Sequence, residues 1–86
     1  MPLVRPLGRV ESPQGTAAYG FESQGRTILV AWAVEEAKPA TISVAGKSWK
    51  AVDIQGNQLN TESVTVAERP VYFVTERTKP EALPWQ

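Results

Sequence analysis

The chain of 86 residues contains no histidine and no cysteine. Without histidine it lacks the most common general base and the most common transition-metal ligand, which excludes Ser-His-Asp and Cys-His catalysis and histidine-based metal sites. Without cysteine it can form no disulfide, thiolate nucleophile or thiolate metal site, and its compartment stays open. We therefore expect no cofactor and no metal ion.

A net charge and a long apolar run are also missing. Nine basic and nine acidic residues cancel and are spread along the chain, so we expect no surface for nucleic acid. The longest apolar run, 28–34, is too short to cross a membrane, and the first ten residues lack the apolar segment of a signal peptide. We expect a soluble protein that binds no membrane.

Helical periodicity is absent as well. Segment 34–38 has helical composition, but Pro39 ends it after little more than one turn. The apolar runs are short, rich in β-branched and aromatic residues, and separated by Gly, Pro, Asn or Asp, as is typical of strands. We expect strands at 7–10, 17–23, 26–34, 40–45, 49–54, 58–60, 63–66 and 71–75.

This strand spacing predicts an all-β fold, a small antiparallel β-sandwich of about eight short strands. The chain has room for one domain, over residues 1–77. Residues 78–86 contain Pro80 and Pro84 and are interpreted as a C-terminal tail.

The clearest local unit is a hairpin whose turn is Gln24-Gly25. Gly25 can take the positive φ that a two-residue primed turn requires. The resulting antiparallel register contains the pairs Glu22 with Thr27, Phe21 with Ile28, Tyr19 with Val30, and Ala17 with Trp32.

Alternation divides this hairpin into two faces. The bulky face, which we assign to the core, contains Ala17, Tyr19, Phe21, Ile28, Val30 and Trp32. The opposite face is apolar but flat, and contains Ala18, Gly20, Leu29, Ala31 and Ala33. Strands that are apolar on both sides usually have both sides covered. We expect the second sandwich layer on the bulky side and another partner on the flat side.

A second corner is expected at 53–57. Asp53 can accept hydrogen bonds from the turn amides, while Gly56 or Asn57 can adopt a left-handed conformation. A calcium loop built from Asp53, Asn57 and Asn60 is the alternative, but their spacing does not follow the Asp-x-Asp-x-Asp-Gly pattern. We favour the structural role.

Acidic residues offer no convincing catalytic pair. Glu35 and Glu36 are adjacent, so their side chains point apart, and no apolar neighbours would raise a pKa. Glu22, Glu62 and Glu68 are interpreted as acids of turns or strand ends. We expect no catalytic residue, and therefore no enzyme.

Aromatic residues are the remaining candidates, because the flat C–H faces of sugars stack on exposed Trp and Tyr. Trp49 points away from Val52 and Ile54 on an alternating strand, so we expect it to be partly exposed. Tyr72 and Trp85 are the further candidates for carbohydrate binding.

Four segments in order resemble a known pattern: the aromatic strand 18–23, the Gly-Arg strand 25–32 that ends on Trp32, the Asp-x-x-Gly-Asn corner 53–57, and the closing Pro-Val-Tyr strand 68–74. Together they resemble the C-terminal β-sandwich of multidomain glycoside hydrolases. The resemblance implies a non-catalytic domain that packs on a (β/α)8 catalytic domain and is secreted if the parent enzyme is extracellular. A barrel of about 250 residues does not fit in this chain, which is either a fragment or a free-standing relative.

Two functions remain open at this point. The first is the accessory domain, whose partner is the catalytic domain of a glycoside hydrolase. The second is a carbohydrate-binding module whose partner is a polysaccharide, with Trp49, Tyr72 and Trp85 as its candidate residues. A self-associating β protein is a further alternative, although Pro39, Pro70 and nearby charges would protect the sheet edges.

Overall fold

The computed structural model describes residues 4–34, 40–44, 49–60, 63–76 and 83–85. Over these ranges the chain is all-β, which confirms the expected fold class. The strands are β1 (Val4–Val10), β2 (Thr16–Ser23), β3 (Arg26–Ala33), β4 (Ala40–Ile42), β5 (Lys50–Val52), β6 (Val64–Val66) and β7 (Val71–Thr75). Among the described residues, no helix is long and apolar enough to span a membrane.

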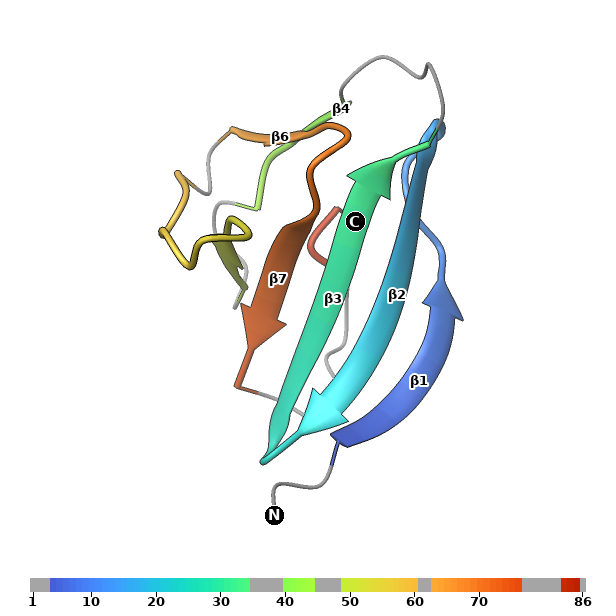
Figure 1. The fold of residues 1–86 in the computed structure, drawn as a ribbon, viewed down its shortest axis with the longest axis vertical. Coiled ribbons are helices and arrows are strands. Elements are labelled where there is room, and N and C mark those ends of the chain that lie inside the picture. Colours follow the sequence, from blue (N-terminus) through green and yellow to red (C-terminus); the bar gives the residue numbers. More distant parts are fainter. Residues whose placement is uncertain (1–3, 35–39, 45–48, 61–62, 77–82, 86) are drawn as a thin grey trace.

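The strands form a five-stranded sheet in the order β1-β2-β3-β7-β5 and a two-stranded sheet of β4 and β6 (Figure 1). Every pairing is antiparallel. The strand expected at 58–60 is reduced to one bridge between Val52 and Gln58.

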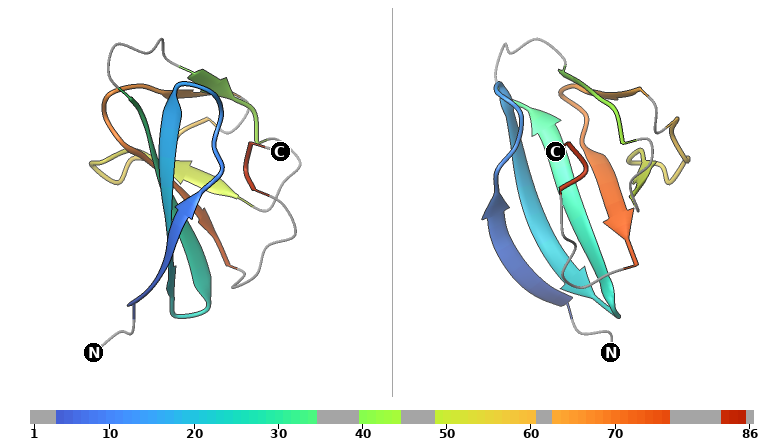
Figure 2. Two further views of the ribbon diagram at one scale, coloured as in Figure 1. Left: turned by 90° about the vertical axis from the view of Figure 1, so that its right-hand side faces the viewer. Right: turned by 180° about the vertical axis from the view of Figure 1, so that it is seen from behind.

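The small sheet and the C-terminal segment lie on the same side of the large sheet. In the edge-on view of Figure 2, β4 and residues 83–85 lie on one side of β2 and β3. No described segment lies in front of β2 and β3 in Figure 1. The described segments therefore cover one face of the large sheet and leave the other open (Figure 1 and Figure 2).

The core lies between the large sheet and these covering segments. Its buried members are Ala18, Leu29, Ala31, Ile42, Val44, Trp49, Ala51, Val64, Val66, Val71 and Phe73, with Val10, Leu59, Leu83 and Trp85 packed at its margin. The large sheet contributes several alanines, which occupy little volume and allow the second layer to come close. Segment 83–85, within the expected tail, packs onto this core.

The expected hairpin register is confirmed at all four predicted pairs. Both turn residues have positive φ, 52° at Gln24 and 80° at Gly25, as a primed two-residue turn requires.

The expected core face of the hairpin is wrong. Ala18, Leu29 and Ala31, on the flat face, are each 1% exposed, whereas Tyr19 is 39% exposed. Phe21, Ile28, Val30 and Trp32 are half-buried. The reason is volume: the covering segments bring their own large side chains, such as Ile42, Val64 and Trp85, and these need small residues opposite them.

This assignment of faces predicts that added volume destabilises the fold at Ala31 but has little effect at the adjacent Val30. Ala31→Leu should lower the free energy of unfolding by about 1 to 3 kcal/mol, because overpacking a closed core is destabilising. The control Val30→Leu should change it by less than about 0.5 kcal/mol, because its added methylene group faces solvent. Urea denaturation measures both values. A larger loss for Val30→Leu would contradict the face assignment.

Candidate functional site

The open side of the large sheet carries four of the seven aromatic side chains of the chain, Tyr19, Phe21, Trp32 and Tyr72. Register places seven large apolar side chains on this side, and we call them the outer face: Tyr19, Phe21, Ile28, Val30, Trp32, Tyr72 and Val74. Phe21, Ile28 and Val74 form one cross-strand row, and Tyr19, Val30 and Tyr72 form the next. The Tyr19 and Phe21 rings lie 5.2 Å apart between centroids.

None of these seven side chains is fully buried. Contiguous apolar patches of this kind mark interaction sites in soluble proteins. Cations lie at both edges: Arg9 on β1 is opposite Tyr19, and Lys50 on β5 is opposite Val74. The outer face is therefore an apolar surface with a basic residue on each edge strand.

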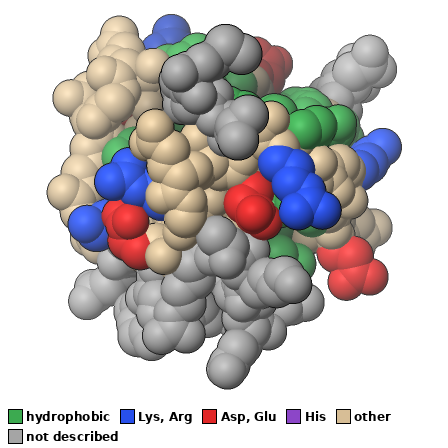
Figure 3. All heavy atoms as spheres, turned by 90° about the horizontal axis from the view of Figure 1, so that it is seen from below, with side chains coloured by type: hydrophobic (Ala, Val, Ile, Leu, Met, Phe, Trp, Pro, Cys, Tyr) green, Lys and Arg blue, Asp and Glu red, His purple; other side chains and the backbone are tan. Residues whose placement is uncertain are grey.

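The hairpin end of the sheet carries both basic and acidic side chains (Figure 3). The guanidinium Nε of Arg26 lies 3.0 Å from a carboxylate oxygen of Glu76, and both side chains are mostly exposed. Figure 3, which views this end, shows basic and acidic side chains next to one another. Among the residues that the structure describes at this end, neither sign dominates, so they offer no directed attraction for a charged partner (Figure 3).

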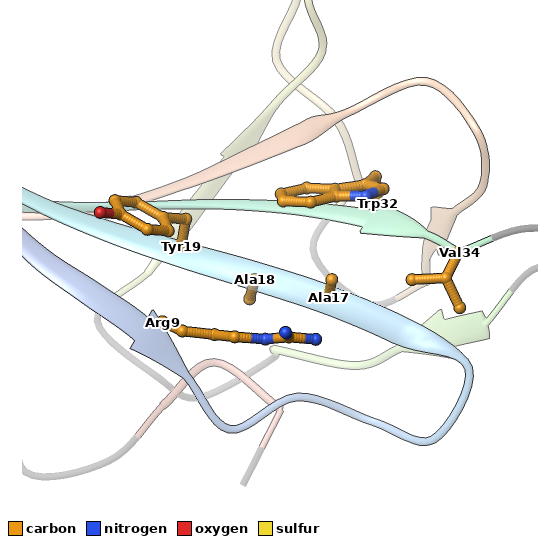
Figure 4. Close-up of a pocket in the computed structure, with 6 residues that line it drawn as sticks. All are labelled: Arg9, Ala17, Ala18, Tyr19, Trp32 and Val34. Atoms are coloured by element: carbon orange, nitrogen blue, oxygen red, sulfur yellow. The ribbon is translucent and has the colours of Figure 1, made fainter.

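A hollow of about 420 Å³ lies at the opposite end of the outer face. It is lined by Arg9, Ala17, Ala18, Tyr19, Trp32 and Val34. In Figure 4, Arg9 extends beside Ala17 and Ala18, while Tyr19 and Trp32 rise on the other side of β2. We call this site the Ala17 hollow.

The structure does not bring the three expected sugar-binding residues together. Trp49 is 5% exposed and lies in the core, so its expected exposure is wrong. It shares a side with Ala51, as expected from alternation, but this side is the inner one. A buried indole presents no free face to a sugar.

Tyr72 and Trp85 lie on opposite sides of the large sheet. Tyr72 belongs to the outer face and is half-buried. Trp85 packs edge-on against Phe73, with ring centroids 5.6 Å apart, and its Nε1 donates a 2.9 Å hydrogen bond to the Glu11 carbonyl. Trp85 therefore fastens the C-terminal segment to the core.

Sequence reasoning missed Tyr19, Phe21 and Trp32 as surface aromatics because it assigned them to the core. The available signal was the alternating row of small residues that contains Ala18, Gly20 and Ala31. A second layer with bulky side chains fits against such a row.

Glu22 and Glu68 are the acids of the expected set that the structure describes; Glu35, Glu36 and Glu62 lie outside the described residues. Glu22 is half-buried at the end of β2, and Glu68 is exposed in a bend before β7. Over the described ranges, no group of three or more acidic side chains could hold a metal ion.

The Asp53 carboxylate stabilises the expected corner. Its Oδ1 accepts 2.9 Å hydrogen bonds from the backbone amides of Gln55 and Asn57, and its Oδ2 accepts one of 3.3 Å from the Asn57 side chain. Gly56 takes the left-handed conformation, with φ of 86°. The Asn57 backbone amide is the main cause that lowers the pKa of Asp53.

Comparison with known proteins found no matching family model, no similar curated protein and no similar solved structure. The outer face, the Ala17 hollow and the sequence resemblance are therefore the features that bear on function.

The Asp53 hydrogen bonds predict a pH-dependent stability. Because the folded state lowers this pKa below its ordinary value of 3.8, the stabilisation is complete well above that value and is lost as the pH falls through the lowered pKa. Asp53→Ala should therefore be less stable than the wild type at pH 7, and the difference should shrink in acid. Asp53→Asn keeps an acceptor without titrating, so its stability relative to Asp53→Ala should vary little with pH. If the difference in the free energy of unfolding between wild type and Asp53→Ala stays constant down to strongly acidic pH, the role of the carboxylate is contradicted.

Proposed function

We propose that this domain is a non-catalytic accessory β-sandwich that packs its outer face against the (β/α)8 catalytic domain of a glycoside hydrolase. The proposal rests mainly on the cross-strand rows of the outer face. In these rows, large apolar side chains from the adjacent strands β2, β3 and β7 remain partly exposed. A covering partner would remove this apolar surface from water.

The energetic case follows from the composition of the outer face. Burial of apolar area contributes about 25 cal/mol per Å², and interfaces between domains of one chain bury about 600 to 1,500 Å². Trp and Tyr are enriched among the residues that dominate binding energies. Trp32, Tyr19 and Tyr72 supply these residue types on one surface.

The choice of partner depends on the sequence resemblance. Three of its four segments, 18–23, 25–32 and 68–74, lie largely on β2, β3 and β7. These neighbouring strands carry the seven side chains of the outer face. The segments that resemble glycoside hydrolase accessory domains are therefore the ones that build the open surface.

The docking surface differs from the one expected from sequence. The flat face of Ala18 and Ala31 was the expected contact surface, but it lies in the core of this domain. The proposed contact therefore moves to the outer face. The alternative function is a carbohydrate-binding module. Because Trp49 is buried, sugar rings would have to stack instead on Tyr19 or Trp32, the aromatic residues that line the Ala17 hollow.

A direct binding measurement tests the docking proposal. The chain is titrated by calorimetry with separately purified (β/α)8 catalytic domains of glycoside hydrolases from the source organism. We expect one of them to bind, and we expect Val30→Glu to weaken that binding by about tenfold or more, because the charge would be buried without a partner. Thr65→Glu, an exposed site on β6, is the matched control and should bind normally.

Circular dichroism establishes that both variants are folded. Absence of binding to every catalytic domain, or equal binding by wild type and folded Val30→Glu, would overturn the proposal.

A further inference from the structure

The Ala17 hollow combines a small floor with aromatic walls. Ala17 is 5% exposed, and its cross-strand partner is Trp32. Tyr19 follows two residues later on the same side of β2. Because alanine occupies little volume, a space remains at Ala17 that both aromatic side chains line. Its volume of about 420 Å³ is within the usual range of about 300 to 1,000 Å³ for ligand sites.

A cation completes the wall of this hollow. Arg9 lies on β1 opposite Tyr19, and its side chain extends along the hollow (Figure 4). Within the described part of the chain, Arg9 forms no ion pair, in contrast to Arg26, which pairs with Glu76. An arginine guanidinium binds a carboxylate through two parallel hydrogen bonds.

We propose that the Ala17 hollow binds a uronic acid, the carboxylate-bearing sugar ring of an anionic polysaccharide. The C–H face of the ring would lie against Trp32 or Tyr19, and its carboxylate would pair with Arg9. This inference goes beyond the docking function and requires no catalytic partner: because Tyr19 and Trp32 belong to both surfaces, the hollow would bind the sugar when no catalytic domain is docked.

The ligand class follows from the balance of charge and apolar surface. Arg9 supplies a single positive charge among otherwise apolar walls, which suits one carboxylate better than a phosphate backbone that needs several cations. A neutral sugar would use the aromatic walls and leave the guanidinium without an ionic partner. Glu68 lines a neighbouring depression with Trp32 and Val34 rather than the hollow itself, so no acid among the described residues lines the hollow.

Nuclear magnetic resonance titration of the isolated, ¹⁵N-labelled chain tests this site. The probes are the trimer of galacturonic acid and its fully methyl-esterified form, which keeps the rings and removes the charge. We expect the acidic trimer to shift the Trp32 indole N–H and the amides of Ala17 and Tyr19. The ester should bind about tenfold or more weakly, because it cannot form the ionic pair with Arg9.

Three variants distinguish specific binding in the hollow from nonspecific attraction of the acidic trimer to positive charge. Arg9→Gln should weaken binding of the acidic trimer by about tenfold or more, and Trp32→Ala should abolish the shifts at Ala17 and Tyr19. Lys50→Gln removes the same charge from the opposite edge of the outer face and should leave the affinity unchanged. The amide spectrum of each variant reports whether it is folded.

Three results would overturn the inference. Equal affinity for the acid and its ester would indicate a neutral-sugar site. Equal shifts with a triglutamate peptide would indicate a carboxylate site for a protein partner. Absence of shifts with the acidic trimer at its solubility limit would exclude the site. Because the titration uses no catalytic domain, its failure is distinct from a failure of the docking proposal.

Discussion

The packing of the second layer on a row of small residues determines the rest of this structure. Ala18 and Ala31 on the large sheet leave room for Val64 on the small sheet, and all three side chains are buried. A core of this kind depends on close fit, because protein interiors are packed as densely as organic crystals. The small sheet, the 83–85 segment and the inner face thus form one closed unit.

The small sheet and the 83–85 segment cover the alanine-rich face of the large sheet, and the described residues leave its aromatic face open (Figure 2). Strand alternation forces neighbours of the buried alanines to point outward, and at these positions the sequence places Tyr19, Val30, Trp32 and Tyr72. A small domain buries a smaller fraction of its surface on folding and is only marginally stable. Large apolar side chains that it leaves on the surface therefore indicate a binding surface. Both proposals use this surface: docking uses the broad rows of side chains, and sugar binding uses the hollow at their end.

Local features were predictable from sequence, while the choice between the two faces was not. Gly25 fixed the hairpin turn, and every pair in its register followed from alternation. Alternation also grouped the residues of each face correctly, but it cannot indicate which group faces inward when both are apolar. That choice depends on which strands cover the sheet, and hence on contacts between elements distant in sequence, such as β3 and β6. The error at Trp49 has the same origin.

Solvent accessibility of the aromatic rings tests this account most directly. A neutral gadolinium chelate added to the protein accelerates the relaxation of protons that solvent can approach, and nuclear magnetic resonance resolves it ring by ring. We expect strong enhancement at Tyr19, Trp32 and Tyr72 and little at Trp49 and Phe73, in keeping with their burial. Protection of Tyr19, Trp32 and Tyr72 together with enhancement at Trp49 and Phe73 would contradict it, because the core would then lie on the opposite side of the sheet.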